Sequence, residues 1–414
     1  MAETLRPETE DQLIEAMAWA AADSVQLEVI GTGTKRAIGA PVKTAYTLDL
    51  SGLWGITHYE PSELVMTARA GTSLNEIQQA IAENNQELAF EPIDFADVFG
   101  LEANSDGTNI GTVGGMIAAG FAGPRRIKQG SVRDHTLGFR AVSGRGELFK
   151  SGGKVMKNVT GFDLSKLMAG SFGTLAVMSE VSFKVLPVAE KTRTVLIMGL
   201  GDNSAIQAMS AAMNSAFEVS SAAHLPQTVA MRSGIPRVAD AGAGITAIRV
   251  EGPAPSVAAR CEALRNLLGK FGDVEELHTA NSRALWREIR DVHYFKADGD
   301  DTDSASNLWQ VSVPPASGAA FARQVLDTCD GEAMFDWGGG EVWLSLPKQD
   351  DAAEGSVRSA ITHSGGHATL IRASEDVRHA INVFQPQDPV LASLSKRVKE
   401  SFDPRNILNP GRMY

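Results

Sequence analysis

The chain has 414 residues, of which 43% are hydrophobic and 21% are charged. This composition excludes an intrinsically disordered chain, and the length favours two domains, or three. The 50 acidic residues outnumber the 38 basic ones and give a net charge of −12, which argues against a general nucleic-acid binder and against attachment to anionic lipid through a basic surface. Only two cysteines occur, Cys261 and Cys329, which excludes a disulfide scaffold and a Cys-rich zinc or iron–sulfur site within this chain.

Residues 1–6 lack the basic-then-apolar pattern of a signal sequence, and the chain has no run of about 18 apolar residues. We therefore expect a cytoplasmic protein without a transmembrane segment. Any contact with a membrane would be peripheral.

The first part of the chain alternates helix and strand patterns. A capping box at Thr9–Gln12 predicts the start of a helix, and residues 26–30 predict a strand that ends at Gly31. A second capping box at Ser73–Glu76 predicts another helix, which residues 84–85 would end.

Longer strands follow. Residues 136–142 and 147–150 predict a hairpin. Residues 175–185 alternate between apolar and polar side chains, which is typical of a half-buried strand. We place a domain boundary at Pro187, where this strand pattern stops.

The middle of the chain repeats a strand-then-helix order at residues 194–217, 245–271 and 308–328, and a further strand is expected within 337–346. This alternation predicts an α+β domain with helices packed on one face of a sheet. Residues 391–398 predict a helix, which a turn rich in Pro and Gly then ends.

Two glycine-rich segments are candidate ligand loops: residues 31–39, and residues 111–116 with a continuation to Ser131. Glycine allows a backbone to approach a ligand closely, and successive amide N–H groups can then bind an anion. Lys35, Arg125 and Arg126 could balance its charge. A pyrophosphate is the ligand that this pattern indicates.

The pattern alone does not identify the ligand. Arg36 occupies the place of the third glycine of a G-x-G-x-x-G fingerprint, and the chain has no G-x-x-x-x-G-K-[ST] loop. A dinucleotide would have to be held by another loop geometry, or the two segments are structural turns.

Several further segments, in order along the chain, resemble the FAD-binding domain of the vanillyl-alcohol-oxidase (PCMH-type) flavoprotein family: residues 60–65, 70–74, 160–164, 173–175 and the tail 402–411. Within that family, residues 285–290 and 365–372 are similar to the FAD-binding subunits of bacterial glycolate oxidase.

The resemblance implies an α+β fold in three parts. Residues 1–187 would form a PCMH-type FAD-binding domain of two subdomains, and residues 188–375 would form an α+β cap domain. Residues 376–414 would return to the FAD domain.

The resemblance also implies a set of positions that contact FAD. In the first loop, the residues that would cradle the pyrophosphate are Gly31, Gly33, Thr34, Lys35 and Gly39, and in the second loop those that would approach it are Thr112, Val113, Gly114 and Gly115. The adenosine and flavin sites would be lined by the continuation of the second loop, at Gly123, Arg125, Gly130, Ser131 and Asp134, and by a strand at Leu175, Ala176 and Val177. Pro92 would lie in a turn that precedes the flavin.

Some members of the family attach the flavin covalently through a histidine in or near the first loop. This loop has no histidine, and the nearest one, His58, is expected to be an ordinary loop residue. We therefore expect non-covalent FAD.

Related dehydrogenases have a histidine-rich metal site. Here His363 and His367 have the i, i+4 spacing of a zinc site on a helix, but Gly365 and Gly366 lie between them and no third ligand is evident. We expect no metal.

The catalytic residues are not identifiable from the sequence. Arg290, Arg372 and His293 could bind a substrate carboxylate or could pair with the surplus of acidic side chains. Trp286 and Trp309 are expected to pack the core of the cap.

The function implied is that of the FAD-binding subunit of a heteromeric glycolate oxidase, which oxidises glycolate to glyoxylate and passes electrons through flavin to an iron–sulfur subunit. A related FAD-containing catalytic subunit would complete the complex, and any membrane association would arise through these partners. The alternatives are a self-sufficient FAD oxidase of another hydroxy acid or alcohol, and a scaffold without flavin.

Overall fold

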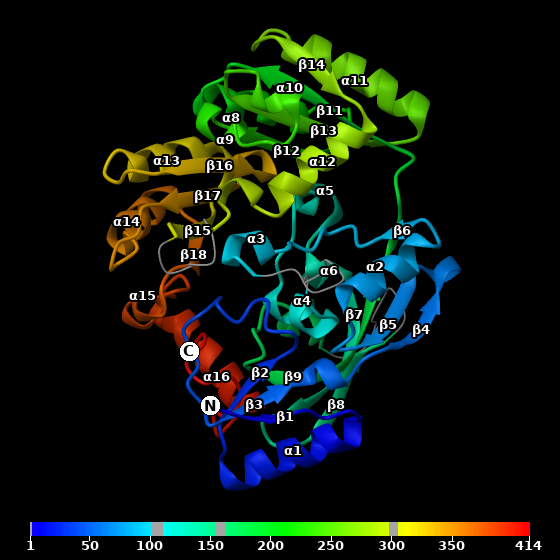
Figure 1. Ribbon diagram of the computed structural model, residues 1–414, viewed down its shortest axis with the longest axis vertical. Coiled ribbons are helices and arrows are strands. Elements are labelled where there is room, and N and C mark those ends of the chain that lie inside the picture. Colours follow the sequence, from blue (N-terminus) through cyan, green and yellow to red (C-terminus); the bar gives the residue numbers. More distant parts are fainter. Residues whose placement is uncertain (1, 102–110, 154–161, 298–304) are drawn as a thin grey trace.

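The computed structural model describes residues 2–101, 111–153, 162–297 and 305–414. Figure 1 shows two bodies. The N-terminal part of the chain, as far as β10 (Leu186–Pro187), and the last helix form the lower body, and a large sheet with its helices forms the upper one. Among the described residues, no helix combines the length and apolarity that crossing a bilayer requires.

A small parallel sheet begins the lower body. Its order is β1-β3-β2, with β1 (Glu3–Leu5), β2 (Leu27–Ile30) and β3 (Tyr46–Asp49). Helix α1 (Glu10–Asp23) starts where Thr9 Oγ1 accepts the Gln12 N–H at 3.2 Å, as the capping pattern predicted. Its apolar face packs on this sheet in one buried cluster.

A five-stranded antiparallel sheet follows, in the order β4-β5-β9-β7-β8. Its strands are β4 (Ile56–Glu60), β5 (Val65–Arg69), β7 (Thr136–Ser143), β8 (Leu148–Gly152) and β9 (Ala176–Lys184). The predicted hairpin is confirmed as β7 and β8.

The expectation that the strand of residues 175–185 is half-buried is wrong. Strand β9 is central in the sheet and is buried along nearly its whole length. Its polar positions are buried with partners, since Ser179 Oγ donates to Glu10 Oε1 at 2.7 Å and Ser182 Oγ lies 2.8 Å from Thr67 Oγ1. The alternating polar residues of this strand therefore include buried serines that form hydrogen bonds, and they do not mark a solvent-exposed face.

Short elements connect these sheets. They are η1 (Leu50–Gly52), η2 (Pro61–Glu63), α2 (Leu74–Ala82), α3 (Ala96–Phe99), α4 (Val113–Ala119), α5 (Arg126–Gln129), α6 (Val132–His135), α7 (Ser165–Met168), and the paired strands β6 (Gln86–Glu87) and β10 (Leu186–Pro187). The predicted second helix is α2, for which Ser73 provides the N-cap.

The upper body contains an eight-stranded antiparallel sheet in the order β14-β11-β13-β12-β16-β17-β15-β18. The strands are β11 (Lys191–Met198), β12 (Val219–Leu225), β13 (Ile245–Gly252), β14 (Val274–Leu277), β15 (Asn307–Ser312), β16 (Glu332–Asp336), β17 (Glu341–Leu346) and β18 (His367–Arg372).

Helices cover both faces of this sheet, so the expectation of helices on one face is wrong. One face packs against α8 (Asp202–Met213), α11 (Ala254–Leu268), α13 (Gly318–Leu326) and α14 (Glu354–Ser364). The other packs against α3, α9 (Gln227–Ala230), α10 (Pro236–Ala239), α12 (Thr279–Arg290) and η3 (His293–Phe295). The sheet is apolar on both sides: Val195 and Ile197 face one cluster and Leu196 the other.

Trp286 and Trp309 are fully buried in these two clusters, which confirms their predicted packing. Each indole N–H has an acceptor, Thr194 Oγ1 at 2.8 Å for Trp286 and the Ala352 carbonyl at 2.9 Å for Trp309. The remaining short helices are η4 (Pro315–Ser317) and η5 (Trp337–Gly339).

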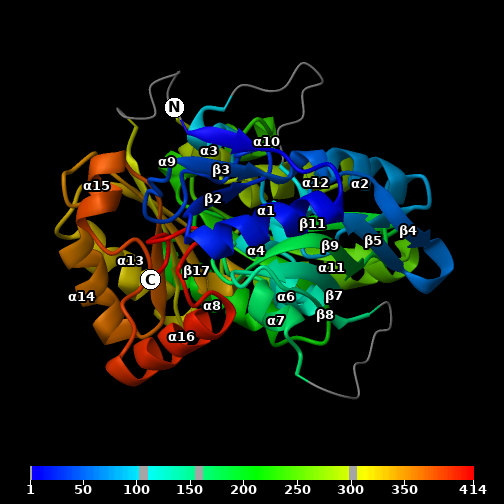
Figure 2. The same ribbon diagram turned by 90° about the horizontal axis from the view of Figure 1, so that it is seen from below.

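The C-terminal segment returns to the lower body. Helices α15 (Glu375–Ala380) and α16 (Pro389–Phe402) follow α14 along one side of the molecule (Figure 2). The tail then pairs with β2: the Leu27 N–H donates to the Ile407 carbonyl at 2.7 Å, and the Asn409 N–H donates to the Leu27 carbonyl at 3.0 Å.

Candidate functional site

The structure brings the two glycine-rich loops into contact. A Cβ added at Gly31 would lie 2.4 Å from Thr112 Oγ1, so only glycine permits this approach. Thr112 is itself fixed by a β-bridge to Ser73. The loops lie far apart in sequence and form adjoining walls of one cavity.

This cavity, here called the loop cavity, is lined by nine of the predicted FAD contacts: Gly31, Gly33, Thr34, Lys35, Thr112, Gly114, Gly115, Ala176 and Val177. Other walls come from residues that were not predicted: Val29, Ile30, Thr32, Arg36, Leu50, Ala70, Ala118, Ala119, Phe172, Gly173, Met178 and Arg412.

The first loop offers backbone donors. Among the described residues, the amides of Thr32, Gly33, Thr34 and Lys35 bond to no protein acceptor. Gly33 has a φ of +79°, and a Cβ there would meet nothing within 4 Å. Consecutive unpaired amides beside a cavity are suited to an anion with several oxygen atoms.

The second loop offers shape but few donors. The Val113 N–H donates to the Thr72 carbonyl at 2.9 Å and the Gly114 N–H to the Ala70 carbonyl at 2.7 Å. The Gly115 N–H donates to Thr112 Oγ1 at 3.2 Å. Because the amides of residues 113–115 are occupied, this part of the second loop can bound the cavity closely but offers no free N–H to a ligand.

Lys35 places a cation in the loop cavity, and no described acidic side chain lies within ion-pair distance of it. Within the described part of the chain, its ammonium group makes no hydrogen bond or ion pair. Burial lowers the pKa of Lys35 to about 8, an effect that Asp94 opposes only in part. An anionic group in the cavity would compensate this buried charge.

The C-terminal tail supplies a further wall through Arg412. Its side chain is buried, lies 3.4 Å from Glu28 Oε1, and leaves its Nε without a partner among the described atoms. Burial lowers the pKa of Arg412 to about 10. The tail motif pointed to this region, but nothing in its pattern singled out Arg412.

The other predicted contacts do not line the loop cavity. Val113 and Leu175 are buried in the apolar core. Gly39 packs against Arg412, where a Cβ would lie 2.8 Å from Cγ. Gly130, Ser131 and Asp134 form the turn and capping box at the start of α6. Pro92 lines a different pocket, next to α12, and Gly123 packs between Glu91 and Arg290.

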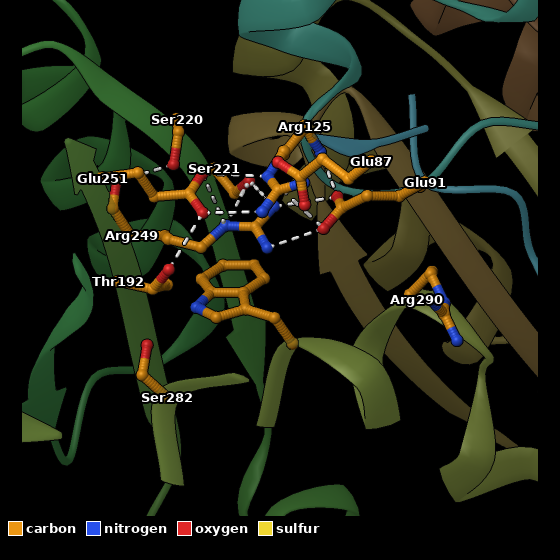
Figure 3. Close-up of polar contacts among 12 residues, drawn as sticks. Glu87, Glu91, Arg125, Thr192, Ser220, Ser221, Arg249, Glu251, Ser282 and Arg290 are labelled. Atoms are coloured by element: carbon orange, nitrogen blue, oxygen red, sulfur yellow. Dashed lines mark hydrogen bonds and ion pairs between the residues drawn. The ribbon is translucent and has the colours of Figure 1, made fainter. Parts of the chain in front are cut away.

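Arg125 belongs to a buried cluster of ion pairs (Figure 3). Its guanidinium lies 2.9 Å from Glu87, 3.6 Å from Glu91 and 2.7 Å from Glu251. Arg249 forms a bidentate pair with Glu91 at 2.7 and 2.8 Å. The cluster joins the lower body to strand β13, and its arginines lower the pKa of Glu251 to about 2. Arg125 therefore connects the two bodies.

The three candidate carboxylate-binding groups also have protein partners. Arg290 makes a bidentate pair with Asp291 at 2.7 and 2.6 Å. Arg372 donates to the carbonyls of Val98 and Phe295. His293 lies 2.7 Å from Asp97.

His363 and His367, whose spacing resembled a zinc site on a helix, do not lie on one helix. Helix α14 ends at Ser364, and His367 begins β18, so His363 and His367 lie on different elements. Among the described residues, no three His, Cys, Asp or Glu side chains cluster as metal ligands. His58 is half-buried on β4 and does not line the loop cavity.

A second cavity, here called the interdomain pocket, adjoins the loop cavity. It has a volume of about 320 Å³ and shares Ala119 and Phe172 with the loop cavity. Its polar lining comes from α5, α6 and the sheet of the upper body: Arg126, Ser131, Arg133, Gln310, Ser312, His367 and Thr369. Sequence reasoning named Arg126 and Ser131 as candidate ligand contacts but missed the part of this wall that β15 and β18 provide, whose signal was polar residues at alternate positions in these strands.

Comparisons with known proteins agree with this geometry. A family model of the FAD binding domain matches residues 2–152, and a model of the C-terminal domain of FAD linked oxidases matches residues 379–413. Glycolate oxidase subunit GlcE of Escherichia coli (strain K12) is 35% identical over 97% of this chain and 96% of that protein. Glycolate oxidase subunit GlcD of Bacillus subtilis (strain 168) is 26% identical over 74% of this chain and 68% of that protein.

The fold is shared with solved protein structures. An alkyldihydroxyacetonephosphate synthase aligns with a TM-score of 0.70 at 16% identity and covers 98% of this chain and 76% of that chain. The unpaired amides and the ammonium of Lys35 fit the diphosphate of the dinucleotide that the family binds. The chain thus belongs to the FAD-linked oxidoreductases, in the family of glycolate oxidase subunit GlcE, and its cofactor is FAD.

Proposed function

We propose that this chain is the FAD-binding subunit of a heteromeric glycolate oxidase, which converts glycolate to glyoxylate. The observation that supports this most is the similarity to GlcE along nearly the whole length of both chains. The loop cavity supports the flavin role independently, because it brings together an ammonium group and backbone amides that have no partner among the described residues.

We assign the diphosphate of FAD to the first loop. The amides of residues 32–35 would donate to its oxygen atoms, and Lys35 would balance part of its charge. Thr112 and Gly115 would close the opposite side by shape, since their loop has no free amide at residues 113–115. Arg412 would complete the cavity from the tail. We expect the FAD to be non-covalent.

Oxidation of a 2-hydroxy acid needs two things from the protein. When bound, FAD accepts the hydride from the α-carbon. This chain must bind the carboxylate and provide an acceptor for the hydroxyl proton. The interdomain pocket adjoins the loop cavity and has both a cationic and an imidazole side chain in its lining. We propose it as the substrate site.

Electron transfer beyond the flavin needs another chain. An iron–sulfur cluster is held by several cysteine thiolates, and this chain has two cysteines in all. We propose an iron–sulfur subunit and a related FAD-containing subunit as partners in the cytoplasm. The similarity to GlcD, a second glycolate oxidase subunit, supports such a complex.

The visible spectrum of the purified chain tests the proposal. We expect a yellow protein that releases its flavin on denaturation. Glycolate should reduce this flavin once the partner subunits are added. Reduction by glycolate without partners would instead favour a self-sufficient oxidase. A preparation that stays colourless after incubation with FAD would contradict the proposal and favour a scaffold.

A further inference from the structure

A row of polar side chains crosses the sheet of the upper body next to the interdomain pocket. The strand register pairs His367 with Ser312, Ser312 with Glu341, and Glu341 with Asp336, so these four positions share one face of four adjacent strands. The same face is apolar at its other end, where Leu308 and Ile371 join a core cluster. The sheet face therefore changes from core to polar wall where it meets the pocket.

The pocket lining is cationic in an acidic protein. The chain has a net charge of −12, yet the lining includes Arg126 and Arg133 and contains no Asp or Glu among the described residues. Burial and the nearby charge of Arg126 lower the pKa of His367, which favours the neutral form of this imidazole in the lining. Local positive charge without acidic partners is the electrostatic condition for binding a small anion.

Arg126 is the cation best placed to bind that anion. Its guanidinium stacks on the Trp337 ring at 4.2 Å from the ring centroid. Within the described part of the chain, its side chain makes no hydrogen bond or ion pair. A stacked guanidinium keeps its planar edge free for a bidentate contact with a carboxylate.

The nearest buried carboxyl groups do not neutralise this charge under mildly acidic conditions. Gln310, which lines the pocket, donates to Glu341 at 2.6 Å, and Glu341 is not itself part of the lining. Burial raises the pKa of Glu341 to about 7 and raises the pKa of Asp336 well above its usual value. Below pH 7 Glu341 is therefore mainly uncharged, and burial also favours the neutral form of Asp336.

We propose that the interdomain pocket is a carboxylate-binding site in which Arg126 is the carboxylate ligand. The proposal rests on the proposed function for the class of ligand, a small 2-hydroxy acid, and on the geometry for the site. The shared walls at Ala119 and Phe172 place this ligand beside the cavity assigned to FAD. Trp337 would orient the guanidinium by stacking.

Binding of oxalate, which is a small carboxylate without an α-hydrogen, tests the site on the full-length chain. We expect calorimetry to show that R126Q weakens oxalate affinity at least tenfold, and that R126K, which keeps the charge but loses the planar fork, restores part of it. The control R397Q removes the same charge from the exposed side of α16, outside the pocket, and should change the affinity less than twofold.

Two results would overturn the inference: no oxalate binding to the unaltered chain, or equal affinity in R126Q. If R126Q does not fold, R126K alone decides. A site that needs only a positive charge at position 126 predicts no loss of oxalate affinity in R126K, whereas a bidentate contact predicts a loss. Oxalate binding through Arg126 without any oxidation of glycolate would leave the site standing and contradict the proposed function. If R126Q oxidises glycolate with an unchanged KM, the proposed function would stand and the assignment of Arg126 as the carboxylate ligand would be contradicted.

Discussion

Lys35 illustrates how one residue can oppose stability and serve binding. Its charge is buried beside a cavity without a counter-ion among the described residues, and burial lowers its pKa to about 8. A lysine whose folded pKa lies below its unfolded value destabilises the folded state at every pH where both forms are protonated. Such a cation is expected where a ligand supplies the missing charge.

Replacement of Lys35 by Met should therefore act in opposite directions on the apoprotein and on FAD binding. We expect K35M to raise the free energy of unfolding of the apoprotein by about 1–2 kcal/mol at pH 7. The gain should shrink as the pH rises through 8 towards 10, because the wild-type ammonium then loses its proton. FAD affinity should fall at least tenfold.

Urea unfolding without FAD and fluorescence titration with FAD measure the two effects. Lys43→Met is a suitable control, because Lys43 is largely exposed and its one ion-pair partner in the described part of the chain is the exposed Glu375. A K35M protein with unchanged FAD affinity would contradict the assignment of the diphosphate to the first loop.

Glu341 is a second residue that should make the stability of the protein depend on pH. Burial raises its pKa to about 7, so the folded state binds a proton that the unfolded state has released between about pH 4.5 and 7. Stability should fall as the pH rises through this window. E341Q, which keeps the hydrogen bond from Gln310, should be more stable than the wild type by about 1–3 kcal/mol at pH 8 and by little at pH 4.5. Urea unfolding at both pH values checks this.

Helix α4 shows why a glycine near a ligand is not always a ligand contact. Gly114 lines the loop cavity, but its N–H donates to the Ala70 carbonyl and a Cβ would lie 2.9 Å from Ala70 Cβ. Its role at the level of the element is to let α4 pack tightly on the end of β5. Large substitutions at Gly114 would test this packing before they test flavin binding.

We expect G114A to lower the free energy of unfolding by about 1–3 kcal/mol, as overpacking does. G355A in α14 is the matched control, because a Cβ there meets nothing within 4 Å. It should be neutral or slightly stabilising. Equal stabilities of the two variants in urea unfolding would contradict the packing role.

Local patterns were informative where the chain's neighbours in sequence are also its neighbours in space. The capping residues Thr9 and Ser73 marked helix starts, and the hairpin of β7 and β8 followed from its turn. The burial of β9 could not be predicted, because it depends on hydrogen bonds from Ser179 and Ser182 to other elements. The same limit applies to the site: the role of Arg125 depends on Glu251, which is 126 positions away.

At the scale of the whole molecule, the ion-pair cluster around Arg125 and Arg249 connects the two bodies (Figure 3). Its members are mostly buried, and removal of one partner from a buried pair leaves an uncompensated charge. The arginines lower the pKa of Glu251 to about 2. Its stabilising effect is therefore present above about pH 4.5 and is lost as the pH falls towards 2.

E251Q should lower the free energy of unfolding at pH 7 by about 2–4 kcal/mol. E218Q is the matched control, since Glu218 pairs with Arg260 at 3.1 Å on the surface with 65% of its side chain exposed. Its loss should cost less than about 1 kcal/mol. Comparable losses in the two variants, measured by urea unfolding, would argue against the cluster as the main electrostatic link between the bodies.

The pairing of the tail with β2 has a consequence for the order of folding. The Val29 N–H donates to Asn409 Oδ1 across 380 positions of the chain, and contacts of such separation carry the largest loop-closure entropy. The wall formed by Arg412 should consequently assemble late, after the local hairpins and helices. FAD would then bind after the chain has folded and stabilise the folded state, and would not nucleate folding.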